Sequence, residues 1–412
     1  MAGSKTILKN AKILITGGLG FIGLEVAKQL ADEKSQVLLF DNLSPQIHGA
    51  IPSLSSLPLL RRSAVGVFRG DVCRAADWAS ALADAECVIH LAAETGTAQS
   101  MYEISRYTET NIGGTAALLD YLANHRHQVT KIILASSRSV YGEGAYHCRD
   151  CGPVYPLARS EARLCAAVWE PVCPACQGEI EARATPEGAQ TAPASIYAAT
   201  KLAQENLLRV AAEALGISVI IFRFQNVYGE GQSLRNPYTG ILSIFSNQLR
   251  TGQTINLYED GQESRDFVHV SDVAHAVVLG VNGDGADGVT LNVGSGQPTS
   301  VEQVACLLRD RLGGEAAPAV SGQYRRGDIR HGYADLTAIR SRLGFTPQVS
   351  LEEGLTRFVE WVRTQPAEPD RLVRAAGELV ARGLMSPPSP AGASPETSIG
   401  DGDQGRSRAA SV

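Results

Sequence analysis

The sequence predicts an α/β protein built around a doubly wound parallel sheet that helices cover on both faces. In the first 140 residues, short runs of consecutive apolar residues alternate with segments of helical apolar period. Runs without polar alternation indicate strands buried on both faces, which is typical of parallel sheets. A chain of 412 residues that is 44% hydrophobic can also bury a large core.

The predicted strands follow one another at regular intervals, each separated from the next by a helical or turn-rich segment. They cover residues 12–16, 36–40, 64–68, 86–91 and 131–134. The first helix is expected over residues 21–31, and a long loop rich in Pro, Ser and Gly over residues 43–62. Helix and strand patterns resume at Tyr197 and Ile217 after an irregular stretch.

Composition excludes several classes of protein. The 37 Lys and Arg against 43 Asp and Glu give a net charge of −6, without the dominant cationic face of a nucleic-acid binder. No apolar run approaches the roughly 20 residues that cross a bilayer, and the first ten residues lack the apolar core of a secretory signal. We expect a cytoplasmic protein that binds neither nucleic acid nor membranes. Its eight cysteines are then thiols or metal ligands rather than disulfides.

A glycine-rich turn, TGGLGFIG, follows the first predicted strand and opens the first helix. Gly17, Gly20 and Gly23 fit the dinucleotide fingerprint, in which the helix N-terminus receives a diphosphate. An ordinary tight turn is the alternative. Asp41 ends the second strand, where a carboxylate accepts ribose hydroxyls and repels a 2′-phosphate, so NAD is favoured over NADP. Asp71 ends the third strand and is placed to meet the adenine.

A tyrosine and a lysine four residues apart begin the helix that follows the irregular stretch. Tyr197 and Lys201 share one helical face, and an ammonium group near a phenol favours the phenolate that could take a proton from a sugar hydroxyl. Ser137, in SSRSVYG at the end of a predicted strand, could share that hydroxyl. Without the glycine turn, the alternative of an exposed helical pair would be preferred.

Two CxxC pairs lie in the irregular stretch, separated by 21 residues. This spacing suits a closed, structural zinc site with four thiolate ligands, which would order a segment of little apolar periodicity. The predicted ligands are Cys148, Cys151, Cys173 and Cys176. A redox pair and unliganded thiols are the alternatives, and His147 and Cys165 are substitute ligands.

The motifs, taken together and in order, resemble the extended short-chain dehydrogenase/reductase enzymes that act on nucleotide sugars. They are TGGLGFIG, FDNLSP, GDV, HLAA, NIGGT, SSRSVYG, YAATK, FRFQNVYGEGQ, ESRDFVHVSDVA and RRGDIRHGYAD, within residues 10–363. The resemblance implies a Rossmann-type fold with a smaller C-terminal substrate-binding lobe, a tightly bound NAD and a nucleotide-sugar substrate. It also implies a homodimer formed through the helices after NIGGT and YAATK.

The resemblance assigns roles to residues that match the family motifs. The implied catalytic residues are Ser137, Tyr197 and Lys201. The implied NAD-binding residues are Gly17, Gly20, Phe21, Ile22, Asp41, Asn42, Asp71, Val72 and Ala92, together with Tyr197 and Lys201. The implied substrate-binding residues are Ser137, Arg138, Asn226, Arg265, Arg325 and Asp328. Arginines suit this last role because they make bidentate, charge-assisted contacts with a diphosphate.

The residues after Ser137 distinguish the reactions of this family. Its 4,6-dehydratases carry an Asp–Glu pair there, whereas this chain has Arg138 and Ser139, neither of which can act as the required acid. Glu143 is the alternative acid. We therefore expect an NAD-dependent 4-epimerase, with a 4,6-dehydratase, a 4-ketoreductase and an NAD-sensing binding module as alternatives. The cysteine-bearing insert resembles that of family members acting on dTDP-6-deoxy-L-hexoses such as dTDP-L-rhamnose.

The predicted domain organisation combines these patterns. A Rossmann domain over residues 1–142 continues at 196–235 with the catalytic helix, and a zinc-knuckle-like insertion occupies 143–195. Residues 236–365 form mainly the substrate-binding lobe, and 366–412 a C-terminal helix and a disordered tail that begins near Gly383.

Overall fold

The computed structural model describes residues 11–49, 57–238, 240–366 and 372–387. Within these residues, a seven-stranded parallel sheet in the order β13-β9-β5-β4-β1-β2-β3 forms the centre of the fold. Its strands are β1 (Lys12–Thr16), β2 (Gln36–Asp41), β3 (Val65–Arg69), β4 (Cys87–His90), β5 (Lys131–Ser137), β9 (Ser218–Phe224) and β13 (Thr290–Val293). The chain reverses its direction of growth between β1 and β4, which opens a crevice at the carboxyl ends of these strands. The predicted α/β class is confirmed.

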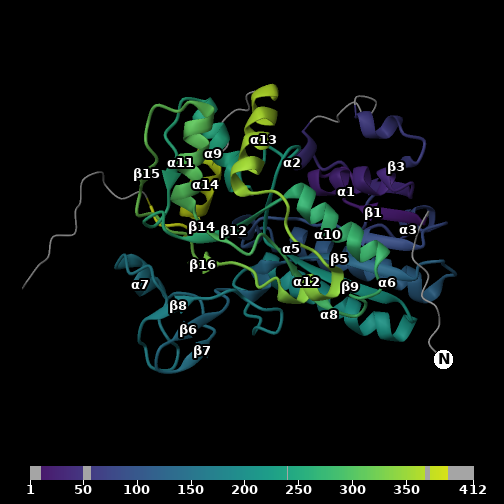
Figure 1. Cartoon of the computed structure of the whole chain (residues 1–412), viewed down its shortest axis with the longest axis horizontal. Helices are drawn as coiled ribbons and strands as arrows, with labels where there is room; N and C mark the ends of the chain where they lie inside the picture. The colour runs from purple at the N-terminus through teal and green to yellow at the C-terminus, as the bar shows by residue number, and fades with distance from the viewer. Residues whose placement is uncertain (1–10, 50–56, 239, 367–371, 388–412) are drawn as a thin grey trace, which may run out of the picture.

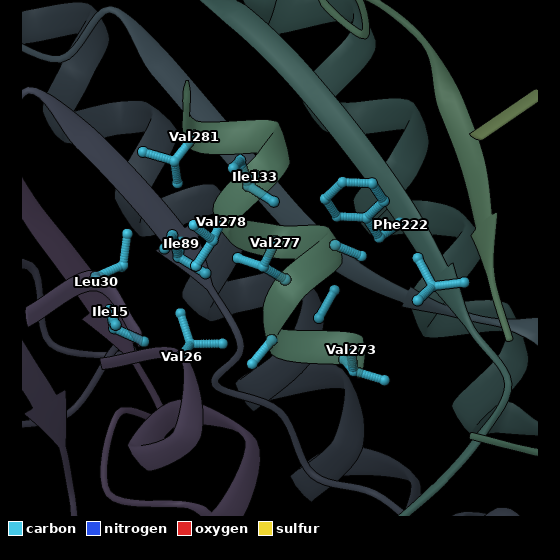
Figure 2. Close-up of a cluster of buried hydrophobic side chains, with 14 of the residues drawn as sticks. Ile15, Val26, Leu30, Ile89, Ile133, Phe222, Val273, Val277, Val278 and Val281 are labelled. Carbon is cyan, nitrogen blue, oxygen red and sulfur yellow. The ribbon is translucent and has the colours of Figure 1, made fainter. Parts of the chain in front are cut away.

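Helices cover both faces of this sheet, as continuous apolar strands require. The covering helices are α1 (Phe21–Asp32) and α10 (Val270–Asn282), and α3 (Ala75–Ala81), α6 (Gly114–Asn124) and α8 (Ile196–Leu215). Figure 2 shows α10 on the sheet, with Val277 and Val278 in the same cluster of buried side chains as Ile89 and Ile133. Burying such side chains contributes about 1.5–3 kcal/mol each before entropy is counted. These helices stabilise the large sheet, and the candidate site lies at the carboxyl ends of its strands.

Residues 236–365, predicted to form mainly the smaller lobe, also contribute elements to the large sheet and its core. Strand β13 pairs with β9 at the edge of the large sheet, and α10 and α12 (Thr337–Leu343) supply buried residues to the same core. The physical reason is that the apolar face of α10, with Val273, Val277 and Val281 at most 1% exposed, needs an extended sheet to cover it.

The smaller lobe contains a second sheet with its own core. Its strands are β10 (Asn226–Tyr228), β12 (Ser264–His269), β14 (Pro298–Ser300) and β16 (His331–Gly332), beside a pair formed by β11 (Asn256–Leu257) and β15 (Ala319–Val320). Its helices are α9 (Ile241–Arg250), α11 (Val301–Leu312) and α13 (Leu351–Thr364). Tyr228, Phe245 and Phe358 are buried between these elements. Figure 1 shows this lobe beside the carboxyl ends of the large sheet's strands.

The cysteine-rich insertion is a small unit that projects from the body of the molecule (Figure 1). It contains β6 (Tyr146–Cys148), β7 (Gly152–Val154), β8 (Ile180–Ala182) and α7 (Glu161–Cys165). Two ion pairs attach it to the smaller lobe. Arg159 donates to both carboxylate oxygens of Glu259 at 2.8 Å in a buried pair, and Arg330 donates to the half-exposed Glu170 at 2.6 Å. Arg159 also donates to the carbonyl oxygen of Asp328 at 3.0 Å, which ties the insertion to the RRGDIR loop.

The C-terminal part of the chain returns to the smaller lobe as α14 (Leu372–Ala381). The predicted tail begins too early, because Ser386 donates from its backbone to Tyr324 and Met385 is 4% exposed. The backbone hydrogen bond of Ser386 and the burial of Met385 hold these residues in place, although the residues around them are polar. The rest of the predicted tail, residues 388–412, lies outside the described residues.

The remaining short elements lie in the connections. They are α2 (Pro45–His48) and a 3-10 turn (Pro58–Arg61) in the expected long loop, α4 (Thr97–Ser100), α5 (Ile104–Tyr107), a π-helical turn (Thr108–Gly113) and a 3-10 turn (Arg138–Tyr141). Among the described helices, none combines the length and the hydropathy that crossing a membrane requires.

Candidate active site

A cavity of about 440 Å³ lies where β5 and β9 end and the smaller lobe begins. The structure brings into its lining every residue predicted to be catalytic or to bind substrate, together with two further residues predicted to bind the dinucleotide. These are Ser137, Arg138, Tyr197, Lys201, Asn226, Arg265, Arg325 and Asp328, with Phe21 and Ile22. The other predicted dinucleotide residues lie outside the cavity, on the turns after β1 to β4.

The glycine turn joins β1 to α1 so closely that Gly17 and Gly23 have no room for a side chain. Gly17 has a φ of +63°, and a Cβ there would lie 2.9 Å from the backbone nitrogen of Ala92. A Cβ on Gly23 would lie 2.7 Å from the carbonyl oxygens of Gly17 and Gly18. Gly20 caps α1 without a side-chain hydrogen bond, so the first amide N–H groups of the helix are available to an anion.

The carboxylate of Asp41 lies at the end of β2, where the sequence predicts it. It accepts hydrogen bonds from the backbone of Leu19 at 3.0 Å and Leu43 at 2.8 Å, which tie the glycine turn to the second strand. Asn42 donates to Asp71 at 3.3 Å and joins the ends of β2 and β3. These residues line the path that a dinucleotide would follow from the glycine turn toward its adenosine end.

Val72 and Ala92 have mainly steric roles at the neighbouring strand ends. A Cβ built on Gly114 would lie only 2.7 Å from the side chain of Val72. The glycine therefore lets the start of α6 pack closely against the turn after β3. The backbone of Ala92 donates to the hydroxyl of Thr16 at 3.1 Å, which holds the turn after β4 beside Gly17.

Tyr197 and Ser137 meet at the floor of the cavity although 60 residues separate them in sequence. Burial raises the pKa of Tyr197 above its ordinary value, and a hydrogen bond with Ser137 opposes that rise. Ser139 donates to the Ser137 hydroxyl from its backbone at 3.2 Å and from its side chain at 3.0 Å. Ser100 accepts from the backbone of Tyr197 at 3.0 Å and fixes the start of α8.

Lys201 lies one helical turn after Tyr197 on α8 and is buried beside the end of β5. It donates to the carbonyl oxygen of Ala135 at 2.9 Å, and burial lowers its pKa to about 7, against an opposing effect of Glu205. About half of its charge is therefore lost near neutral pH. Burial is the largest influence on the pKa of Tyr197, and the stabilisation of its phenolate by Lys201 stays a prediction.

The opposite end of the cavity carries the predicted diphosphate-binding residues. Arg325 forms an ion pair with Asp328 at 3.0 Å, and its guanidinium lies 4.9 Å from the centre of the Tyr258 ring. Arg265 donates three hydrogen bonds to the carbonyl oxygens of Ser264, Ile329 and Arg330. Because a guanidinium has five N–H donors, about two remain for a ligand. Asn226 begins β10 and lines the cavity between the two ends.

Arg138 and Glu143 follow Ser137 in the sequence but lie in different surroundings. Arg138 lines the cavity, donates to the carbonyl oxygen of Gly142 at 2.7 Å, and has its pKa lowered by burial to about 10. Glu143 lies outside the lining, where its carboxylate is 3.3 Å from Arg159 and accepts from the backbone of Arg330 at 2.8 Å. The carboxylate of Glu143 is therefore engaged in holding the insertion.

Sequence reasoning missed several residues of the cavity. Tyr258 supports Arg325, and Glu263 lines the cavity with a pKa that burial raises to about 7. The helix α14 contributes four lining residues, Leu372, Ala375, Ala376 and Leu379. The helical period of this segment was a visible signal, but nothing in the sequence indicated that it reaches the cavity.

The four predicted metal ligands come together at the base of the insertion. The sulfur atoms of Cys148, Cys151, Cys173 and Cys176 all lie within 4.8 Å of one another. The Sγ atoms of Cys148 and Cys176 are 3.6 Å apart, close to the roughly 3.8 Å that tetrahedral zinc with 2.3 Å bonds imposes. The donor set therefore fits a closed tetrathiolate site. Cys165 is not part of the cluster and contacts the hydroxyl of Tyr324 at 3.0 Å.

Comparisons with known proteins agree with this geometry. The NAD dependent epimerase/dehydratase family matches residues 13–162 and 171–294. The chain is 40% identical over 359 residues to the dTDP-L-rhamnose 4-epimerase of Burkholderia thailandensis, covering 87% of this chain and 96% of that protein. The UDP-glucose 4-epimerase of Thermotoga maritima, solved with UDP-glucose, has a TM-score of 0.69 at 28% identity and covers 85% of this chain and 98% of its own. The UDP-glucose 4-epimerase of Thermus thermophilus, solved with NAD, has a TM-score of 0.66 at 25% identity and covers 86% and 100%.

Proposed function

The chain belongs to the NAD dependent epimerase/dehydratase family, and from this premise we propose which sugar it acts on. It is an isomerase, an NAD-dependent nucleotide-sugar 4-epimerase. We propose that its substrate is a dTDP-6-deoxy-L-hexose such as dTDP-L-rhamnose, because the relative that is 40% identical along almost its whole length bears that activity in its name.

The observation that carries the reaction is the meeting of Tyr197 and Ser137 beneath a cavity whose other end holds Arg265 and Arg325. Tyr197 takes the proton of the 4-hydroxyl, and Ser137 shares a hydrogen bond with the same oxygen. The chemistry that NAD supplies when bound is the reversible oxidation of carbon 4. Gly17 and Gly20 would let the cofactor diphosphate approach the start of α1, and Asp41 would accept hydrogen bonds from its ribose.

Elimination is disfavoured by the carboxylates of the cavity. Among the residues that the structure describes, the acids in its lining are Glu263 and Asp328, and both lie at the arginine end. Glu143, the alternative acid for a 4,6-dehydratase, is paired with Arg159 outside the lining. This arrangement supports epimerisation over dehydration.

Three further features of the protein belong to the same proposal. The four clustered cysteines would hold a structural zinc ion, which would order the insertion. The chain would form a homodimer through α6 and α8, as the family resemblance implies, and Val210 is 75% exposed on α8. The cytoplasmic location stays a prediction.

The function is tested by incubating the purified protein, without added NADH or NADPH, with dTDP-L-rhamnose and a panel of other nucleotide sugars. We expect the 4-epimer of dTDP-L-rhamnose and no net reduction. A 4-keto-6-deoxy product would identify a dehydratase, a requirement for added NADPH a reductase, and bound NAD without turnover of any sugar a sensor. Conversion of another nucleotide sugar in place of dTDP-L-rhamnose would overturn the substrate.

The role of Tyr197 is tested by Tyr197→Phe. We expect epimerisation to fall by about 10²-fold or more, because a positioned acid–base group contributes this much, while the bound NAD content stays the same. Tyr121→Phe is the matched control, since Tyr121 lies on α6 outside the cavity, stacked on His125. Full activity in Tyr197→Phe would show that another group moves the proton.

A further inference from the structure

The C-terminal helix α14 and the residues that follow it cover one end of the substrate cavity. We propose that this segment is a fixed wall of the nucleotide subsite and sets the affinity of the enzyme for the nucleoside diphosphate part of its substrate. The inference rests on the proposed function and adds to it a segment outside the sequence motifs.

One face of α14 is directed into the cavity. Leu372, Ala375, Ala376 and Leu379 line it, and their spacing of three and four residues places them on one side of the helix. Ala375 is 3% and Leu379 5% exposed, whereas Val373 on another face is 72% exposed. The lining residues of α9 include Ile241 and Phe245, so the two helices bound the same space. Figure 1 shows α14 among the helices of the smaller lobe.

A hydrogen-bonded group of side chains joins α14 to both sides of the cavity. Glu378 accepts from the hydroxyls of Tyr102 and Tyr238, each at 3.2 Å, and those hydroxyls are 3.0 Å apart. Arg382 stacks on Tyr102 with its guanidinium carbon 4.3 Å from the ring centre. Tyr102 precedes α5 of the larger domain, and Tyr238 precedes α9 of the smaller lobe. The helix is thereby held across the boundary between them.

The segment after α14 pairs with the strand-like stretch that carries Arg325. Met385 forms an antiparallel bridge with Arg325, and the backbone of Arg326 donates to Leu384 at 3.0 Å. Ser386 accepts at its hydroxyl from the backbone of Tyr324 at 2.9 Å. This pairing orients the arginine that would contact the diphosphate.

The groups around the wall suit a pyrimidine base. The side-chain oxygen of Gln248 is buried and lacks a hydrogen-bond partner within the described structure, and Gln248 lines the cavity. An unsatisfied buried acceptor is costly, so a ligand N–H is its expected partner. The ring N–H of thymine or uracil can donate to it, while the flat face of the base packs on the small apolar side chains of α14.

The proposal is tested by substituting the same residue on two faces of α14. Ala376→Phe places a ring in the cavity, and Val373→Phe places it in solvent. Calorimetric titration with dTDP should show affinity weakened by about 10- to 100-fold in Ala376→Phe and unchanged in Val373→Phe. The KM of the nucleotide sugar should rise to the same degree, with kcat changed by less than about threefold. The bound NAD content should stay constant, because the contacts of α14 lie outside the glycine turn.

A second pair of variants removes the wall. A chain ending at residue 366 should lose dTDP affinity to a similar extent, and a chain ending at residue 387 should keep it. Unchanged dTDP affinity in a folded Ala376→Phe protein overturns the proposal, even if the shortened chain misfolds. Because dTDP binding needs no turnover, tight dTDP binding without epimerisation would refute the proposed function and leave the wall intact.

Discussion

At the floor and the arginine end of the cavity, burial changes the acid–base properties of single residues in directions that the sequence does not reveal. It raises the pKa of Tyr197, lowers that of Lys201 to about 7 and raises that of Glu263 to about 7. In each case the low-dielectric surroundings disfavour the charged form. Two groups with ordinary values far from neutrality thus titrate near pH 7, where small changes in pH alter the charge of the cavity.

Glu263 should make substrate binding depend on pH. Its pKa is raised in the fold, so the carboxyl is protonated below about pH 7 and becomes an anion as the pH rises through that value. The anion would lie near Asp328 and repel a diphosphate. We expect the KM of the nucleotide sugar to rise by up to about tenfold per pH unit above pH 7. Kinetics across this range would measure it.

The control for this effect is Glu263→Gln, which preserves the shape of the side chain without the charge. Its KM should stay flat over the same pH range. An equal rise of KM in both proteins would assign the titration to another group. The stability linkage has the same sign: a raised folded pKa stabilises the fold below the unfolded value of about 4.5, and this contribution is lost as pH rises through about 7.

At the scale of elements, two connections differ in what determines their structure. They are the turn between β1 and α1 and the insertion between β5 and α8. The turn depends on local backbone conformation, which the residue types specify directly. The insertion depends on its attachment: the side chain of Arg159 is 1% exposed between Glu143 and Glu259, so it links the insertion to the smaller lobe. Removing one partner of a buried pair would leave an uncompensated charge.

Two glycines of the turn should respond differently to the same substitution. Gly17→Ala meets both a positive φ and the backbone of Ala92, so we expect a loss of about 1–3 kcal/mol in the free energy of unfolding. Gly20 has an ordinary φ of −68°, and its nearest obstacle is 3.2 Å away, so Gly20→Ala should fold with nearly normal stability but retain little NAD. Thermal unfolding and the nucleotide released on denaturation measure the two effects. Full NAD content in Gly20→Ala would contradict this role of the turn.

The cysteine cluster should account for the metal content of the protein. Elemental analysis should find about one zinc per chain, and Cys176→Ser should lose it with a lowered midpoint of thermal unfolding, because the insertion has a small core. Cys165→Ser is the matched control within the same insertion and should keep its zinc. Wild-type protein without zinc, purified in the absence of chelators, would refute the site.

At the scale of the whole molecule, the ends of β5 and β9, the smaller lobe and α14 line one cavity, whereas the described strands and helix of the insertion lie outside its lining. Val210 is 75% exposed on α8, one of the two helices of the proposed dimer.

The oligomeric state should follow from that surface. Light scattering should give about twice the chain mass of 43.7 kDa for the wild type. Val210→Glu should shift the mass toward a single chain, because a charge in an apolar interface is costly. Val320→Glu, at a residue 54% exposed on β15 of the smaller lobe, is the control that should remain dimeric. A single-chain mass in the wild type would overturn the dimer.

Local patterns were sufficient for much of the fold. The strands near residues 12, 36, 65, 87 and 131, the glycine turn and the cysteine pairs were predicted because apolar runs, backbone conformation and ligand spacing act over a few residues. The meeting of Tyr197 and Ser137 in one cavity followed from their matching the family motifs.

Contacts between distant segments had no such signal, and the tertiary structure decided them. It placed β13 in the large sheet, paired Arg159 with Glu259 across 100 residues, turned Lys201 toward Ala135, and brought α14 onto the cavity. Sequence therefore determined which elements form and which chemistry they carry, because those properties depend on neighbours along the chain. Only the packed fold determined burial, and with it the pKa values and the walls of the site, because burial depends on segments that the chain brings together from far apart.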